Sequence, residues 1–126
     1  MRETIGRMGE ERARRFLERA GLTILDSNWR SPEGEIDIVA ADGEVVVFVE
    51  VKTRRGSLFG SPEESITREK RRRLQRAALD YLQSHNRLGS PWRIDVVTIQ
   101  GDPRRRDARL EHLADVIEAD EDTLYG

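Results

Sequence analysis

The stretch GEIDIVAADGEVVVFVEVKTRR, from Gly34 to Arg55, constrains the fold of this chain more than any other. Two runs rich in Val and Ile flank an Asp-Gly pair, which is the strongest short-range signal for a two-residue hairpin loop. We therefore predict antiparallel strands at about 35–41 and about 44–54. The second strand is apolar on both faces through Val49, a pattern typical of a central strand that is covered on two sides.

Charged residues are embedded in this apolar hairpin. Glu35 and Asp37 lie in the first run, and Glu50 and Lys52 end the second. With the Asp-Gly pair as the loop, these four side chains share one face of the sheet, and Asp37 lies opposite Phe48. Asp37 and Glu50 are then diagonal neighbours with backbones about 7–8 Å apart. Carboxylates this close repel each other unless protonation or a divalent metal relieves the repulsion.

The residue types at this end of the hairpin predict a magnesium or manganese site. The chain contains no cysteine, and carboxylate oxygens without nearby His or Cys ligands select Mg²⁺ or Mn²⁺ over zinc. Asp37 and Glu50 would hold the ion, and the carbonyl of Val51 would be a further ligand. Lys52 would lie beside a metal-bound water, which it could orient or deprotonate. Phosphodiester hydrolysis is the reaction that this combination suits.

Two further acidic residues each have two readings. A helical stripe over about 4–20 includes Ala13 and Leu17, and Glu10 shares that inward-facing stripe. Glu10 could therefore reach the same site, or it could favour the helix N-terminus or pair with an arginine. Glu35 could lie behind the metal ligands or be a solvated charge at the end of a strand.

A second helix is predicted from an N-cap at Thr67 to about Ser84, and it is strongly basic. Between Lys52 and Arg76 there are nine basic residues against three acidic ones, although the whole chain has a net charge of −2. Such an excess suits the phosphates of a nucleic acid, and it equally suits a solvated helix face. The candidate nucleic-acid-binding residues are Arg54, Arg55, Arg68, Lys70, Arg71, Arg72, Arg73 and Arg76.

The remaining segments complete an α/β pattern. We predict strands at about 22–30 and 92–99 and a short helix at about 110–117. Residues 1–117 would form a single domain, and the acidic tail 118–126 would fray. The order of elements indicates a mixed β-sheet flanked by helices. No apolar run is long enough to span a membrane, and without cysteine or a signal-like start we expect a cytoplasmic location.

Several other conspicuous residues have structural interpretations. Asp95 could orient a lysine or arginine of a neighbouring strand, and we expect its role to be structural. We interpret His85 and His112 as surface residues, because neither has a partner at metal-ligand spacing. Trp29 and Trp92 suit core packing better than base stacking, since no row of aromatic residues accompanies them.

Taken together, several motifs resemble those of a known family. GRMGEERARRFLERAGLTILDSNWR, GEIDIVA and VFVEVKTRR, followed by a basic helix and WRIDVV, resemble the YraN family of small bacterial proteins over roughly Ile5 to Ile117. That family is similar to archaeal Holliday-junction resolvases and to the PD-(D/E)xK nuclease superfamily, which has a restriction-endonuclease-like fold. Ile36 takes the place of the motif's proline.

The resemblance implies a role for four residues of this sequence. The superfamily's Asp, Glu and Lys fall on Asp37, Glu50 and Lys52, and its helix-borne Glu falls on Glu10. It implies Mg²⁺-dependent cleavage of branched DNA by a homodimer that places two sites symmetrically. Two alternatives stay open: a non-catalytic nucleic-acid-binding protein that keeps the nuclease fold, and an interaction protein with a purely structural ion site.

Overall fold

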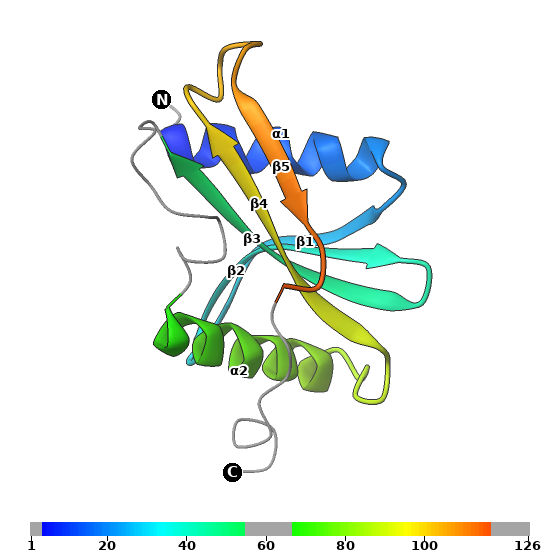
Figure 1. Ribbon diagram of the computed structural model, residues 1–126. Helices are drawn as coiled ribbons and strands as arrows, with labels where there is room; N and C mark the ends of the chain where they lie inside the picture. The colour runs from blue at the N-terminus through cyan, green and yellow to red at the C-terminus, as the bar shows by residue number, and fades with distance from the viewer. Residues whose placement is uncertain (1–3, 55–66, 117–126) are drawn as a thin grey trace.

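The computed structural model describes residues 4–54 and 67–116, which form a five-stranded sheet with one helix on each face (Figure 1). The elements are α1 (Ile5–Arg19), β1 (Thr23–Ser31), β2 (Gly34–Asp42), β3 (Val45–Arg54), α2 (Arg68–Ser84), β4 (Trp92–Gln100) and β5 (Arg109–Leu113). The strand order in the sheet is β1-β2-β3-β4-β5. β3 and β4 are parallel and are joined through α2, whereas the other neighbours are antiparallel. This α/β arrangement confirms the predicted mixed sheet and is consistent with a restriction-endonuclease-like fold.

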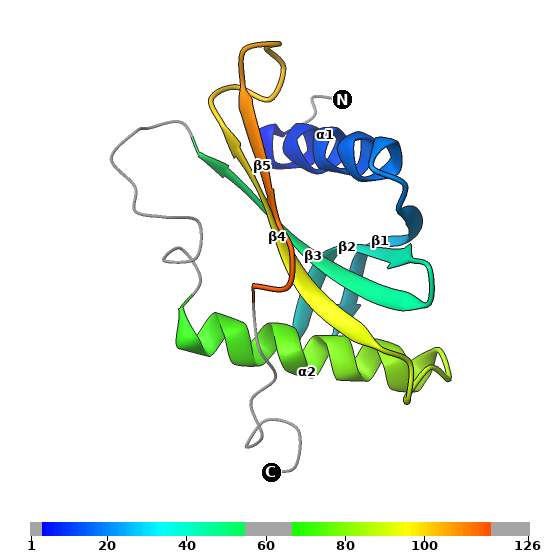
Figure 2. The ribbon, with the colours of Figure 1, turned by 45° about the vertical axis from the view of Figure 1, so that its right-hand side comes forward.

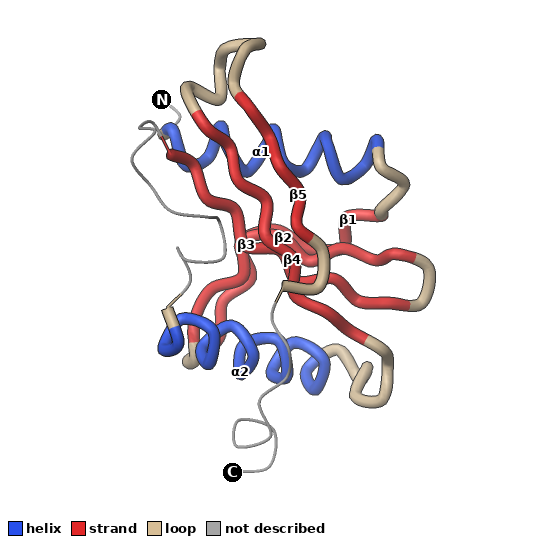
Figure 3. Tube along the Cα trace, viewed as in Figure 1, coloured by secondary structure: helices blue, strands red, loops and turns tan. Residues whose placement is uncertain are grey.

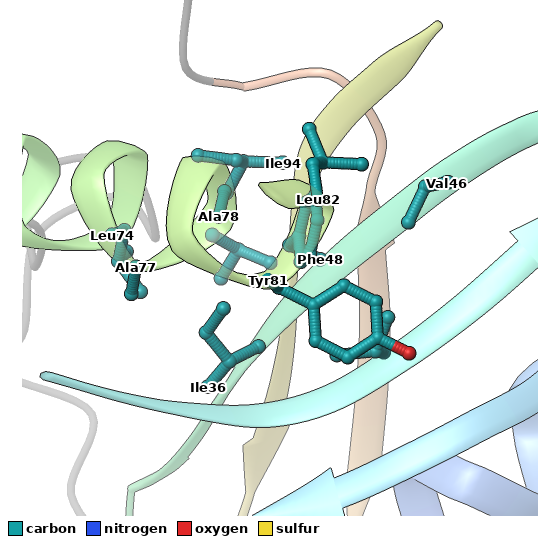
Figure 4. Close-up of a cluster of buried hydrophobic side chains, with 11 residues drawn as sticks. Ile36, Val46, Phe48, Leu74, Ala77, Ala78, Tyr81, Leu82 and Ile94 are labelled. Carbon is teal, nitrogen blue, oxygen red and sulfur yellow. The ribbon is translucent and has the colours of Figure 1, made fainter. Parts of the chain in front are cut away.

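The two helices bury opposite faces of the sheet (Figure 2). The stripe of α1 that contains Ala13 and Leu17 packs on Val47 and Val49 of β3. On the other face, Phe48 lies among side chains of α2 that include Tyr81 (Figure 4). Since successive side chains of a strand point to opposite faces, the apolar run of β3 supplies both cores. The prediction of a central strand covered on two sides is confirmed.

The hairpin forms where the sequence predicts it, but with a different loop. Asp42 pairs with Val45, so the two loop residues are Gly43 and Glu44, and the predicted Asp42-Gly43 loop is wrong. Gly43 has a φ of 60°, whereas Asp42 and Glu44 do not have positive φ. A glycine alone at positive φ in the first loop position matches a type II′ turn, which spares Asp42 a left-handed conformation.

Moving the loop by one residue changes which side chains face each other. The ladder runs from Asp42 opposite Val45 to Ile38 opposite Val49. The ladder ends before Asp37, whose side chain takes the N–H of Val51 in place of a backbone pair. From Ile38 to Asp42 the faces stay as predicted, because the pairing shifts by an even number of positions. Ile36 packs on the α2 side and Ile38 on the α1 side, so the alternation is interrupted at Asp37.

The segment after β4 differs from its prediction. The expected helix at about 110–117 is wrong, since β5 pairs antiparallel with β4 as an edge strand (Figure 3). Leu110 packs in the core beneath α1, and His112 contacts the ring of Phe16 edge-on, whereas Glu111 between them is exposed. This alternation has the period of a strand. In sequence, a run this short fits a helical pattern as well as a strand pattern.

The tryptophans lie where the sequence predicts, and His112 does not. Trp29 and Trp92 pack against the core on the α2 side, as expected. His112 is largely buried, with 17% of its side chain exposed, so its interpretation as a surface residue is wrong. The acidic tail 118–126 lies outside the described residues. Within the described ranges, no helix is long and apolar enough to cross a membrane.

Candidate active site

The carboxylates predicted from the hairpin lie together where β2 and β3 emerge from the core beside the start of α2. They line a hollow of about 400 Å³. Its walls are formed by Gly34, Glu35, Asp37, Glu50, Thr67, Glu69, Lys70, Arg73 and Leu74. The hairpin therefore presents its acids to the basic helix, which the sequence does not reveal.

Asp37 joins the two strands through its side chain. Its Oδ2 accepts a hydrogen bond of 2.8 Å from the backbone N–H of Val51, beyond the last pair of the β2–β3 ladder. Burial, and then the nearby charge of Glu50, raise the pKa of Asp37 to about 7, although the Val51 hydrogen bond acts in the opposite direction. Glu10 and Glu35 add smaller repulsions. The carboxyl thus lies in a strongly acidic surrounding that favours its protonation or a cation.

Glu50 is the most deeply buried acid of the hollow, at 5% exposed, and it is held between two lysines. Its Oε1 lies 3.3 Å from the ammonium of Lys52 and 2.6 Å from that of Lys70. Burial, and then the proximity of Lys70, lower the pKa of Lys52. Burial alone would lower the pKa of Lys70 as well, but its hydrogen bonds to Glu50 and Lys52 raise it.

Glu10 approaches Asp37 from the other side of the sheet. It shares with Asp37 a second hollow of about 270 Å³ between α1 and β1. Burial raises the pKa of Glu10, a hydrogen bond with Asn28 opposes that effect, and the charge of Glu35 raises the pKa further. Glu10 therefore lies near Asp37 but does not line the carboxylate hollow itself. Asn28 was not singled out in the sequence, and in the structure it has a φ of 53°.

Comparison with known proteins assigns the chain to a family. The model of "Uncharacterised protein family UPF0102" matches residues 9–99. The chain belongs to the UPF0102 family. It is 46% identical to a UPF0102 protein of Desulfosudis oleivorans over 94% of this chain and 93% of that one. It is 48% identical to a UPF0102 protein of Beutenbergia cavernae over 91% of this chain and 97% of that one. The resemblance to the YraN group is confirmed.

The basic residues of this UPF0102 chain are spread around the first three turns of α2. Thr67 caps the helix by accepting from the N–H of Lys70, which fixes Lys70 at the rim of the hollow. Arg73 also lines the hollow and pairs with Glu69 at 2.8 Å. The other predicted residues do not line the hollow. Arg68, Arg71 and Arg76 are exposed, Arg72 is half-buried, and Arg54 ends β3. Arg55 lies outside the described residues.

The donor chemistry of this UPF0102 site fits a hard divalent cation. In the part of the chain that the structure describes, no three His, Cys, Asp or Glu side chains are grouped closely enough to enclose an ion. Asp37 and Glu50 would therefore be the two side-chain ligands. A backbone carbonyl, such as that of Val51, and water molecules would supply the remaining ligands. Mg²⁺ is commonly bound in this way, through one or two carboxylates and several waters.

Proposed function

We propose that this UPF0102 protein is a Mg²⁺-dependent endonuclease that acts on branched or structured DNA. The observation that carries the proposal is that Asp37 and Glu50 line one hollow, with the Lys52 ammonium 3.3 Å from the Glu50 carboxylate. Two acids in one hollow and a lysine with a lowered pKa suit phosphodiester hydrolysis better than a purely structural ion site, which has no use for Lys52.

Each residue has a defined task in this proposal. Asp37 and Glu50 hold the cation, which when bound acidifies a water and neutralises charge on a phosphate oxygen. Lys52, whose lowered pKa makes its neutral form more accessible, accepts a proton from the attacking water or donates to the developing phosphate charge. Glu10 limits the space on the far side of Asp37. The arginines of α2 bind the phosphate backbone.

One observation favours a second candidate, a nucleic-acid-binding protein without catalysis. The ammonium of Lys70 already lies 2.6 Å from Glu50, so that the buried carboxylate has a positive partner without a metal ion. A site stabilised in this way could persist as part of a binding surface. It would bind DNA with a strong dependence on salt and would be indifferent to Lys52.

The decisive experiment is a cleavage assay with matched variants. Labelled four-way junction, flap and linear duplex are incubated with Mn²⁺ and with the wild type, Asp37→Asn, Lys52→Met or Asp42→Asn. Asp42 is the control, because it lies on the same strand but pairs with Arg93 at the hairpin end. We expect discrete products from the wild type and Asp42→Asn only. Binding of the junction by all four proteins, without products from any, would reject the nuclease and favour the binding protein.

A further inference from the structure

A second basic surface lies away from the carboxylate hollow, on the side of the sheet that α1 covers. A cleft of about 500 Å³ separates the outer side of α1 from the loop that joins β4 to β5. Figure 1 shows this loop beside α1. The charged residues that line the cleft are six arginines, Arg12, Arg15, Arg19, Arg104, Arg105 and Arg106, and one acid, Glu11. The predicted nucleic-acid-binding residues include none of these arginines.

The loop is held in place by an arginine that is used structurally. The guanidinium of Arg12 donates to the carbonyl oxygens of Pro103, Arg105 and Ala108 at 3.1, 2.5 and 3.3 Å. The backbone adds a turn, in which the N–H of Arg105 donates to the carbonyl of Asp102 at 2.9 Å. Three carbonyls on one guanidinium draw the loop toward α1. The loop arginines are therefore positioned along the cleft before any ligand binds.

Arg104 is held by the carboxylate of Asp102, and the other arginines of the cleft are available to an anion. Arg105 pairs with Asp107 and Arg15 with Glu11, but their side chains are 70% and 68% exposed, and exposed ion pairs are weak. Among the described residues, Arg19 and Arg106 have no acidic partner. Guanidinium groups bind phosphate through paired N–H donors, and a phosphate can replace a weak carboxylate partner.

An aromatic ring in the cleft points to a nucleic acid among the possible polyanions. Phe16 lines the cleft, is 38% exposed and contacts His112 edge-on. An exposed large apolar side chain among arginines offers nothing to a free phosphate. It offers a stacking or packing surface to a base or sugar, as in proteins that bind single strands.

The position of α1 connects this cleft with the proposed active site. The smaller hollow between α1 and β1, which Asp37 also lines, is bordered by Arg7, Glu10 and Arg14 of α1. Glu11 lines both that hollow and the cleft. From Glu10 to Arg19 the helix rises about 14 Å. That length is roughly four phosphate steps of one strand in a duplex. A strand at Asp37 can therefore extend along α1 into the cleft.

We propose that the cleft between α1 and the β4–β5 loop binds the phosphate backbone of a nucleic-acid strand that leaves the carboxylate site. The proposal rests on the proposed function for the identity of that strand as substrate. It also requires contacts on a face of the sheet opposite to α2, so the protein contacts nucleic acid on two sides. The phosphates would engage Arg19 and Arg106 first, because these arginines lose no ion pair on binding.

Binding measurements in the presence of a metal chelator test the cleft independently of catalysis. Arg106→Glu is compared with Arg87→Glu, an exposed arginine in the α2–β4 loop that makes the same change in net charge. We expect Arg106→Glu to weaken binding of a labelled single strand several-fold and to reduce the slope of log Kd against log salt by about one contact. Equal effects of the two reversals would overturn the proposal, because net charge alone would then explain them.

Inorganic polyphosphate, which has no bases, distinguishes a nucleic-acid site from a general anion site. Phe16→Ala should weaken binding of the single strand and leave polyphosphate binding unchanged, whereas Arg106→Glu should weaken both. If Phe16→Ala lowers the affinity for both ligands equally, or lowers neither affinity, the assignment to nucleic acid is overturned. Absence of cleavage in the assay above would reject the nuclease and would leave these binding results standing.

Discussion

Lys70 and Lys52 approach the same carboxylate oxygen from different elements, and Lys70 is the closer. Its ammonium lies 2.6 Å from Oε1 of Glu50, against 3.3 Å for Lys52. The pKa of Lys70 is raised by these contacts, while burial and the charge of Lys70 lower that of Lys52. Lys52, on the strand, therefore loses its proton more readily than Lys70, on the helix. The ammonium of Lys70 also lies beside Glu50, where a metal ion would bind.

Removal of Lys70 should therefore strengthen metal binding. In Lys70→Gln, a divalent ion no longer competes with an ammonium at Glu50, and we expect Mn²⁺ affinity to rise about threefold to tenfold in the absence of nucleic acid. Titration calorimetry with Mn²⁺ measures the change. Arg71→Gln is the control, since Arg71 is exposed on the same helix and does not line the hollow. Unchanged affinity in Lys70→Gln would place the ion away from Glu50.

The protonation of Asp37 should be visible in the pH dependence of stability. An ordinary aspartate has a pKa of 3.8, but in the folded protein that of Asp37 is raised to about 7. Between these values the folded state binds a proton that the unfolded state has lost, so the contribution of Asp37 to stability is complete below about pH 4 and is lost as pH rises to about 7. Above that range the ionised carboxylate is held beside Glu50 at a cost.

Asp37→Asn should remove this cost while keeping an oxygen for the N–H of Val51. We expect the variant to be more stable than the wild type by about 1–2 kcal/mol above pH 7, because solvent screens part of the repulsion, and to lose the advantage near pH 4. Urea denaturation across this range gives the free energies of unfolding. A constant difference at all pH values would contradict titration of Asp37, and Asp42→Asn supplies the matched control.

The sequence predicted which residues share a face better than it predicted their exact register. Asp37 and Glu50 line one hollow and Lys52 contacts Glu50, although the hairpin loop lies one residue later than expected and the ladder ends at Ile38. In contrast, the consecutive basic residues of α2 give no sign in sequence of which one faces the hairpin. Only the packing of α2 against the hairpin selects Lys70 for contact with Glu50, and that contact lies across 20 residues of sequence.

Two other features were hidden for different reasons. The segment that forms β5 is too short for its alternation to exclude a helix, and its strand state depends on the free edge of β4. The cleft beside α1 depends on Arg12, whose hydrogen bonds reach a loop more than 90 residues away. Neither pairing with a distant edge nor a long-range side-chain contact leaves a periodic signal in one sequence.

Asp95 should be essential for folding and not for chemistry. It is fully buried, and its carboxylate accepts from Arg93 at 3.0 Å, from His112 at 2.7 Å and from the N–H of Asp115 at 2.9 Å. Its expected structural role is consistent with these contacts. Asp95→Ala leaves buried donors without a partner and should lower the free energy of unfolding by about 3–5 kcal/mol. Asp107→Ala, at an exposed ion pair, should change it little, and equal losses in the two variants would contradict this account.

Gly9 allows α1 to lie close to β3, the strand that bears Glu50 and Lys52. Gly9 is buried, and a Cβ added there would overlap the hydroxyl oxygen of Thr53. Thr53 is β-branched on a packed strand and cannot easily turn away. Gly9→Ala should therefore lower the free energy of unfolding by about 1–3 kcal/mol, despite the better helix propensity of alanine.

Thr53→Ala provides the rescue that identifies the cause. It removes the oxygen that the new methyl group meets, and the next nearest atoms, Cδ1 of Ile99 and Cβ of Thr53, lie at an ordinary 3.6 Å. The double variant should therefore recover most of the stability that Gly9→Ala loses, and urea denaturation of all four proteins gives the coupling energy. Gly6→Ala on the exposed side of α1, where the nearest atom lies at 3.8 Å, should be tolerated. Simple additivity of the two substitutions would mean that the helix is separated from the strand by some other contact.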